Sequence, residues 1–243
     1  MALWKNIEVV EHGSSMFDRL SGRSRRDYSF YGPRNYFTVG AVLKNPNTEF
    51  GAFLVKVKVT VLNADRRVLA SSETTIPYID PNASFYYGDD FAIIKDTPLR
   101  YEIKAYCDNF IKLPANSSFT KGIRCTSMSI AETDDTYGHP FRLTGRANND
   151  YPMKLDCVSL YFVFFRDAKI VGGVNTSVGM YGNSSEPFNA SMSVNPHCTR
   201  IEYSPSFNVD LLGAEVLKYK ALFDQGIITQ EEFSAKKKQL LGL

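Results

Sequence analysis

A pattern of alternating apolar residues occurs twice in this chain, with an offset of about one hundred residues, the size of a small sandwich domain. Residues 55–62 correspond to residues 158–165, and the preceding residues 37–45 correspond to residues 141–149. Apolar side chains at every second position put one face of a strand into a core and the other toward water. We therefore predict a mainly β chain with two tandem antiparallel β-sandwich (Ig-like) domains, followed by a C-terminal α-helical hairpin.

The predicted domain boundaries follow from this repeat. We expect the first β-sandwich domain over residues 1–112, the second over residues 113–207, and the helical hairpin over residues 211–243. Linkers are expected at residues 112–121 and 204–210, where the alternation stops. The chain contains 17 Phe and 14 Tyr, which fits a β body better than a helical one.

The two copies of the pattern differ in one strand. Residues 55–61 place valines on one face and Lys56 and Lys58 on the other, so the lysine face should meet water. Residues 160–165 are apolar on both faces. That strand should be covered twice, once by its own core and once by either the neighbouring sandwich or a second subunit. The sequence leaves both coverings open.

Local signals define the C-terminal hairpin. Thr229 and Glu232 have the spacing of a capping box, in which each side chain accepts a hydrogen bond from the backbone amide of the other residue. Gly226 can adopt the left-handed conformation that ends a preceding helix. We therefore predict one helix over residues 212–225 and a second over residues 230–241.

The apolar side chains of these helices form more than one stripe. A helix pair this short buries too little apolar surface to offset the cost of ordering its chain. We therefore expect the hairpin to dock on another surface or on copies of itself. The residues predicted to bind the partner are Val216, Leu217, Tyr219, Phe223, Phe233, Leu240 and Leu241.

A family resemblance is carried by Leu217, Lys220, Leu222, Asp224, Gly226, Ile227, Ile228, Thr229, Glu231, Glu232, Phe233, Lys236, Lys237, Leu240 and Leu241. In type and spacing these residues resemble the short C-terminal domain known as SHOCT. The resemblance covers about an eighth of the chain. It implies a small bacterial appendage placed after unrelated domains, with a role in oligomerisation or partner contact and no known catalytic activity.

The β body also resembles the FxLYD type of bacterial sandwich domain. The matching positions are residues 59–63 in the first copy and 162–166 in the second. Only apolar character is kept there, and the Asp of the motif is absent from both copies. Such modules are often found on exported or anchored proteins, whereas this sequence shows no export signal.

Catalytic and metal-binding motifs do not occur in the sequence. The three histidines, His12, His139 and His197, lie outside any nucleophile or metal motif, and the four cysteines form no C-x-x-C pair. Asp89 and Asp90 are predicted to be solvated acids of a loop. We expect no enzymatic activity, no cofactor and no bound metal.

Arginine and aromatic residues alternate over residues 19–36. Arg23, Arg25, Arg26 and Arg34 could bind anions, and neighbouring tyrosines could stack on bases. The same composition suits a protein contact or a loop that covers the end of the sandwich. A ligand- or nucleic-acid-binding module using this loop is therefore the alternative function.

Charge and hydropathy narrow the functional class further. The net charge of +2 gives no global attraction to nucleic acid, and no apolar stretch is long enough to span a bilayer. The start of the sequence lacks the features of a signal peptide, so a cytoplasmic location is expected. We predict a non-enzymatic interaction or scaffold protein whose hairpin binds a protein partner or a second copy of the chain as a homo-oligomer, with nucleic acid as the less favoured partner.

Overall fold

The computed structural model describes residues 4–17, 35–93, 98–113, 118–133, 139, 141–208, 219, 222–223 and 226–241. Within these residues the chain is mainly β, with thirteen strands in four antiparallel sheets, and the helix α2 (Gln230–Leu241) lies at the C-terminal end. No helix within these residues is long and apolar enough to cross a membrane.

The first two sheets, here called the N-terminal sheet pair, contain seven strands. One sheet has the order β1-β2-β5, and the other has the order β4-β3-β6, with β7 also pairing with β3. Their bounds are β1 (Glu8–Phe17), β2 (Asn35–Lys44), β3 (Phe50–Leu62), β4 (Val68–Ile79), β5 (Ser84–Ile93), β6 (Arg100–Tyr106) and β7 (Asn109–Lys112).

The other two sheets form the C-terminal sheet pair, with the orders β8-β9-β12 and β11-β10-β13. When β8 to β13 are matched one by one with β1 to β6, these orders are the same as those of β1-β2-β5 and β4-β3-β6. Their bounds are β8 (Ile123–Glu132), β9 (Phe141–Asn149), β10 (Leu155–Arg166), β11 (Lys169–Met180), β12 (Ser184–Met192) and β13 (Arg200–Phe207).

Each sheet pair has a buried asparagine at the end of its second strand: Asn45 directly follows β2, and Asn149 is the last residue of β9. The Oδ1 atom of Asn45 accepts a hydrogen bond from the amide of Asn47, and that of Asn149 accepts one from the amide of Tyr151, two residues on in both cases. Each side-chain amide also donates to backbone carbonyls that lie farther along the chain. Both buried side chains are thereby satisfied, and each fixes the turn into the next strand.

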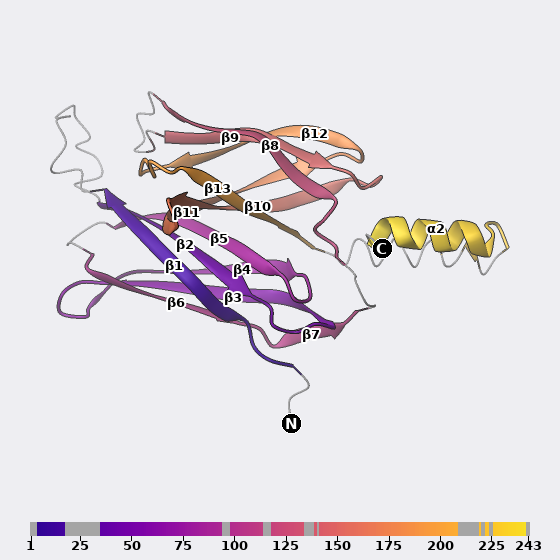
Figure 1. The fold of residues 1–243 in the computed structure, drawn as a ribbon, viewed down its shortest axis with the longest axis horizontal. Helices are drawn as coiled ribbons and strands as arrows, with labels where there is room; N and C mark the ends of the chain where they lie inside the picture. Colours follow the sequence, from indigo (N-terminus) through magenta and orange to yellow (C-terminus); the bar gives the residue numbers. More distant parts are fainter. Residues whose placement is uncertain are drawn as a thin grey trace.

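Figure 1 shows the four sheets stacked as layers. The sheet β4-β3-β6 lies at one outside, followed by β1-β2-β5, then β11-β10-β13, and finally β8-β9-β12 at the other outside. One apolar core fills each sheet pair, and further apolar contacts join the two inner sheets. On the outer face of β3, Lys56 and Lys58 are exposed while the alternating valines are buried, as predicted.

Strand β10 is buried on both faces. Leu160, Phe162 and Phe164 belong to the core of the C-terminal sheet pair. Tyr161 packs in the core of the N-terminal pair, and Phe165 lies in the apolar cluster between the two inner sheets. The predicted double covering is therefore confirmed, and of the two open possibilities the neighbouring sheet pair provides the outer cover.

A row of glycines lies where the two sheet pairs meet. Gly13, Gly40 and Gly88 are register partners across β1, β2 and β5. A β-carbon on Gly40 would overlap the carbonyl oxygen of Gly172, and one on Gly88 would overlap that of Phe162. The inner sheets therefore approach backbone to backbone along this row, which no side chain larger than hydrogen allows.

The predicted linker at residues 204–210 is partly wrong, because β13 continues to Phe207. The hydroxyl of Ser206 accepts a hydrogen bond from the amide of Tyr78 at 2.9 Å and donates to its carbonyl at 3.0 Å. Ser204 accepts a hydrogen bond from the amide of Tyr86. These serines tie the last strand to the N-terminal sheet pair.

The segment that joins the two sheet pairs is held by one buried carboxylate. Asp80 accepts hydrogen bonds from the hydroxyls of Ser118 and Thr120 and from the amide of Phe119, at 2.6 to 2.9 Å. Residues 118–120 of the predicted linker are therefore anchored on the residue that follows β4.

Candidate functional site

A helix ends at Gly226, as the sequence predicts. Tyr219, Leu222 and Phe223 are helical, and Gly226 has a φ of 71°. The amide of Gly226 donates to the carbonyl of Phe223, and the amide of Ile227 donates to the carbonyl of Leu222, both at 2.9 Å. This pair of bonds is a Schellman motif, which satisfies the last carbonyls of the helix.

Helix α2 begins with the predicted capping box. The amide of Thr229 donates to the Glu232 carboxylate at 2.8 Å, and the amide of Glu232 donates to the Thr229 hydroxyl at 3.2 Å. The hydrogen bond from the Thr229 amide lowers the pKa of Glu232 from its ordinary value. The bounds of α2, Gln230–Leu241, agree with the predicted range.

Two of the predicted partner-binding residues contact each other. The rings of Phe223 and Phe233 are stacked with centroids 5.6 Å apart and an angle of 15° between their planes. A third, Tyr219, lies under the ammonium of Lys236, 5.4 Å from the ring centroid, and also packs against the core of the C-terminal sheet pair. Aromatic residues thus join the chain before Gly226 to α2 and to the body.

The other four predicted partner-binding residues cannot be placed as side chains. Val216 and Leu217 lie outside the described residues, and Leu240 and Leu241 are described only as part of the α2 backbone. Sequence reasoning missed Ile227, which is 64% exposed directly after the glycine that ends the helix. The signal that could have found it is an apolar residue in the turn directly after Gly226.

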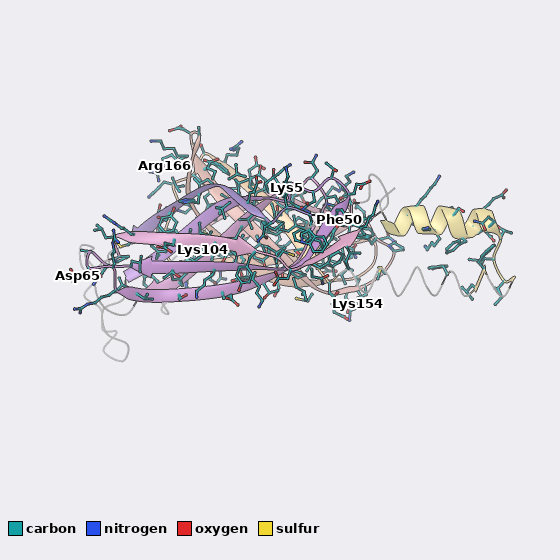
Figure 2. The ribbon with its side chains drawn as sticks, turned by 90° about the horizontal axis from the view of Figure 1, so that it is seen from below. Lys5, Phe50, Asp65, Lys104, Lys154 and Arg166 are labelled. Carbon is teal, nitrogen blue, oxygen red and sulfur yellow. The ribbon has the colours of Figure 1, made fainter. Side chains whose placement is uncertain are left out.

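Helix α2 extends beyond the ends of the four sheets in both views (Figures 1 and 2). Only Phe233, Ser234 and Lys236 are half-buried among the side chains described in α2. The exposed ones are Gln230, Glu231, Glu232, Ala235, Lys237, Lys238 and Gln239. The outward face of α2 therefore remains available for contact.

The predicted arginine loop falls outside the described residues. Arg23, Arg25, Arg26 and Arg34 all lie between β1 and β2, where the structure describes no residue from 18 to 34. The first described side chain after this loop is that of Tyr36, which is 5% exposed and meets the ring of His139 at 6.2 Å. Anion binding by the four arginines stays a prediction.

The acids predicted to lie in a loop are in fact part of β5. The Asp89 carboxylate accepts hydrogen bonds from Ser72 and Tyr87, while burial raises its pKa. Burial also raises the pKa of Asp90 to about 6, although the hydrogen bond from the Ser193 amide and the charge of His139 act in the opposite direction. The prediction of solvated acids is therefore wrong for both residues, since the strand carries them into the contact between the sheet pairs.

Asp90, His139 and Ser193 include the residue types of a catalytic triad without its geometry. The Ser193 hydroxyl lies 2.9 Å from Nδ1 of His139, but Ser193 is only 1% exposed and cannot reach a substrate. Oδ2 of Asp90 accepts from the Ser193 amide instead of orienting the histidine, and its Oδ1 atom is buried with no hydrogen-bond partner. This arrangement does not provide an activated nucleophile.

Metal-binding clusters are absent from the part of the chain that the structure describes. The four cysteines are free thiols: Cys107 and Cys125 are buried, Cys198 is half-buried and Cys157 is exposed. Burial raises the pKa of Cys125 to about 12, so this thiol stays protonated and unreactive.

The C-terminal segment defines the class of domain that this chain carries. Residues 214–241 match the family model of the short C-terminal domain. The segment with the capping box and the Schellman motif is therefore a SHOCT domain, appended to a β body that this match does not cover. No curated protein matches the chain.

Three solved structures show a distant likeness to the chain. Bacteroides uniformis β-glucuronidase has 9% identity over 83% of this chain and 28% of its own, with a TM-score of 0.23. Red sea bream transglutaminase has 10% identity over 82% of this chain and 29% of its own, with a TM-score of 0.21. The tandem CBM22 domains of Paenibacillus barcinonensis Xyn10C have 7% identity over 83% of this chain and 85% of theirs, with a TM-score of 0.15. The chain spans less than a third of the first two proteins, and these scores carry no statement about function.

Proposed function

We propose that this chain is a non-enzymatic interaction or scaffold protein. Two tandem Ig-like β-sandwiches form a rigid body, and the SHOCT segment folds as a helical hairpin that mediates oligomerisation or docking on a protein partner. The partner is a protein or a second copy of the chain, and the expected cytoplasmic location stays a prediction.

The repeated strand order supports the tandem sandwiches. The sheet orders β1-β2-β5 and β4-β3-β6 recur as β8-β9-β12 and β11-β10-β13. Asn45 and Asn149 make corresponding hydrogen bonds at corresponding turns. The glycine row and the apolar outer face of β10 support a rigid contact between the sandwiches.

The two helix caps support the hairpin. A helix that ends at Gly226 and a helix that begins after Thr229 leave only a short turn between them. The stacked rings of Phe223 and Phe233 join the two sides of that turn. Two helices joined in this way run antiparallel in an αα-hairpin.

The position of α2 is the observation that carries the proposal. The helix lies beyond the sheets, and most of its described side chains are exposed. A helix of this length gains most of its stability from packing of an apolar face rather than from its own hydrogen bonds. A partner surface would supply the packing that the sheets do not.

Deletion of residues 211–243 tests the proposal. The truncated chain should have a lower mass by light scattering than the full chain at the same concentration, with an unchanged far-ultraviolet signature of β structure. Unchanged mass, together with failure of the isolated segment to bind any copy of the full chain, would contradict an assembly role for the SHOCT domain.

A further inference from the structure

A groove of ≈ 570 Å³ lies between two strand edges of the C-terminal sheet pair. Residues 128–132 of β8 line one side, and residues 197–201, at and before the start of β13, line the other. Among the described residues, β8 pairs only with β9 and β13 pairs only with β10. Backbone amides and carbonyls on the outer edges of both strands therefore have no strand partner among the described residues.

The floor of the groove is apolar. Half-buried side chains that pack on the core of the C-terminal sheet pair line it: Met128, Ile130, Phe141, Cys198 and Ile201. A groove with apolar residues below and strand edges on both sides suits an extended chain. Such a chain can pair with an edge and place every second side chain on the floor.

In the N-terminal sheet pair, side chains fill the position that corresponds to the groove. Ile201 pairs with Phe164 of β10, and Tyr101 pairs with Val61, the residue of β3 that corresponds to Phe164. The Tyr101 hydroxyl lies 2.7 Å from Nδ1 of His12 on β1.

Tyr101 also covers Phe37, with ring centroids 5.5 Å apart. Phe37 is consequently buried, whereas its counterpart Phe141 remains half-buried in the groove. The C-terminal sheet pair therefore lacks the side chains that close this position.

The size of the groove fits a single short strand. One strand residue fills roughly 160 Å³, from a rise of about 3.3 Å, a strand spacing of about 4.8 Å and a sheet spacing of about 10 Å. The groove thus holds about three or four residues of an extended chain. Immunoglobulin-type sandwiches have a seventh strand beside the strand equivalent to β13, and this sheet pair has none among its described residues.

A second copy of β8 is a poor occupant. The register of β8 shifts between Thr126 and Ser129, and Ser127 has a φ of 53°. A bulge of this kind bends an edge strand and prevents regular pairing of two such edges along their length.

Charge at the rim selects among extended segments. Arg166 donates hydrogen bonds to the carbonyls of Pro196 and His197, and no carboxylate in the described part of the chain pairs with it. Arg200 lies over the ring of Phe165, 4.2 Å from its centroid. Arg200 also pairs with Glu202 at 3.5 Å, and Glu132 lies on the β8 side of the groove. Arg166 is therefore the cation beside the β13 side without an acidic partner among the described residues, which favours an acidic residue at this end of the bound segment.

We infer that this groove binds an extended segment of a partner protein, with alternating apolar residues and an acidic residue at the β13 end, added as a strand at the open edge of the sheet pair. This binding surface is distinct from the SHOCT domain. The partner is a peptide segment rather than a second copy of β8.

Selection of a seven-residue random peptide library on the full-length chain tests the inference. Selected peptides should combine alternating apolar residues with Asp or Glu at one end, and their affinity by fluorescence anisotropy should fall at high salt. Met128→Arg should weaken binding of a selected peptide by at least roughly tenfold, about 1.4 kcal/mol. Val68→Arg, at an exposed position on β4, is the control and should leave the affinity unchanged.

A second variant distinguishes loss of the binding surface from unfolding of the chain. Ile201→Tyr combined with Met128→His places in the groove the side-chain types that close the N-terminal sheet pair. This variant should keep or raise the melting temperature while peptide binding is lost.

The inference is overturned if neither variant weakens binding, if no peptide is selected, or if amide shifts place the peptide away from β8 and β13. It is also overturned if the full chain is a dimer that Met128→Arg dissociates, because a second copy would then occupy the groove.

Discussion

Asp90 brings an ionisable group into the contact between the two sheet pairs. Its carboxylate meets the Ser193 amide, with His139 and Asp89 as the charged or titratable neighbours that affect it. One of its oxygens is buried without a hydrogen-bond partner. The ionised form is therefore the costly form in the folded chain.

Asp90→Asn should remove a pH dependence of stability. Because burial raises the folded-state pKa from 3.8 to about 6, the free energy of unfolding should rise as the pH falls through 6 toward 4. Asn keeps an acceptor for the Ser193 amide and has no charge, so the variant should gain about 1 to 2 kcal/mol at pH 7.5 and lose that slope. Urea unfolding at several pH values measures both effects.

The control for this experiment is Asp65→Asn, at an exposed turn position. It should preserve the slope between pH 4 and 6 that Asp90 is expected to produce. An identical slope in Asp90→Asn and the unmodified chain would show that Asp90 does not cause it.

Features of single residues could be predicted from the sequence where their interaction partners lie only a few positions away. The capping box of Thr229 and Glu232 and the left-handed Gly226 were predicted from sequence, because their partners lie within five residues. The environment of Asp90 was not predictable, since its partners Ser193 and His139 come from distant parts of the chain.

The Thr229 hydroxyl caps the N-terminus of helix α2, so a single substitution can test the stability of this helix. Thr229→Ala should cost the helix about 1 kcal/mol, because the Glu232 amide loses its acceptor. Hydrogen exchange of the α2 amides should then be faster, by roughly fivefold. Thr229→Ser retains the hydroxyl and should leave the exchange rates near those of the unmodified chain; equally fast exchange in both variants would contradict the role of the cap.

Strand positions were largely predictable from alternation, and the exceptions have physical causes. Residues 204–207 resemble a linker because they contain serine and proline, yet Pro205 fits at the edge of a sheet, where an N–H group is not needed. The apolar outer face of β10 indicated a second cover correctly. Only the structure shows that the N-terminal sheet pair is this cover, because alternation does not indicate which surface packs on the outer face of β10.

The contact between the two sheet pairs depends on strand register, a property of the whole molecule. Gly13, Gly40 and Gly88 are far apart in sequence and become neighbours only when β1, β2 and β5 pair. The sequence shows only single glycines in three strands, from which their alignment across the sheet could not be predicted. The candidate site is less complete than the fold, since only Tyr219, Phe223 and Phe233 of its predicted side chains are described.

Gly40→Ala should destabilise the body strongly. The added methyl group would overlap the backbone carbonyl of Gly172 and also meet the Ile170 side chain. Because the backbone cannot turn aside as a side chain can, the inner sheets must separate. We expect a loss of about 2 to 3 kcal/mol in urea unfolding. Gly179→Ala on β11 is the matched control, because its β-carbon would lie 3.1 Å from the nearest atom, the carbonyl oxygen of Asp156, and the loss should be smaller. Equal losses in the two variants would contradict a close contact at Gly40.

The glycine row also limits how this body can be divided or recombined. An isolated half would expose bare backbone on one side or the unpaired outer face of β10 on the other, and either surface invites aggregation. Neither half is therefore a portable unit, despite the repeated strand order. A chain that exchanged one half for an unrelated fold would lose this close backbone approach unless the replacement also carried glycines opposite the row.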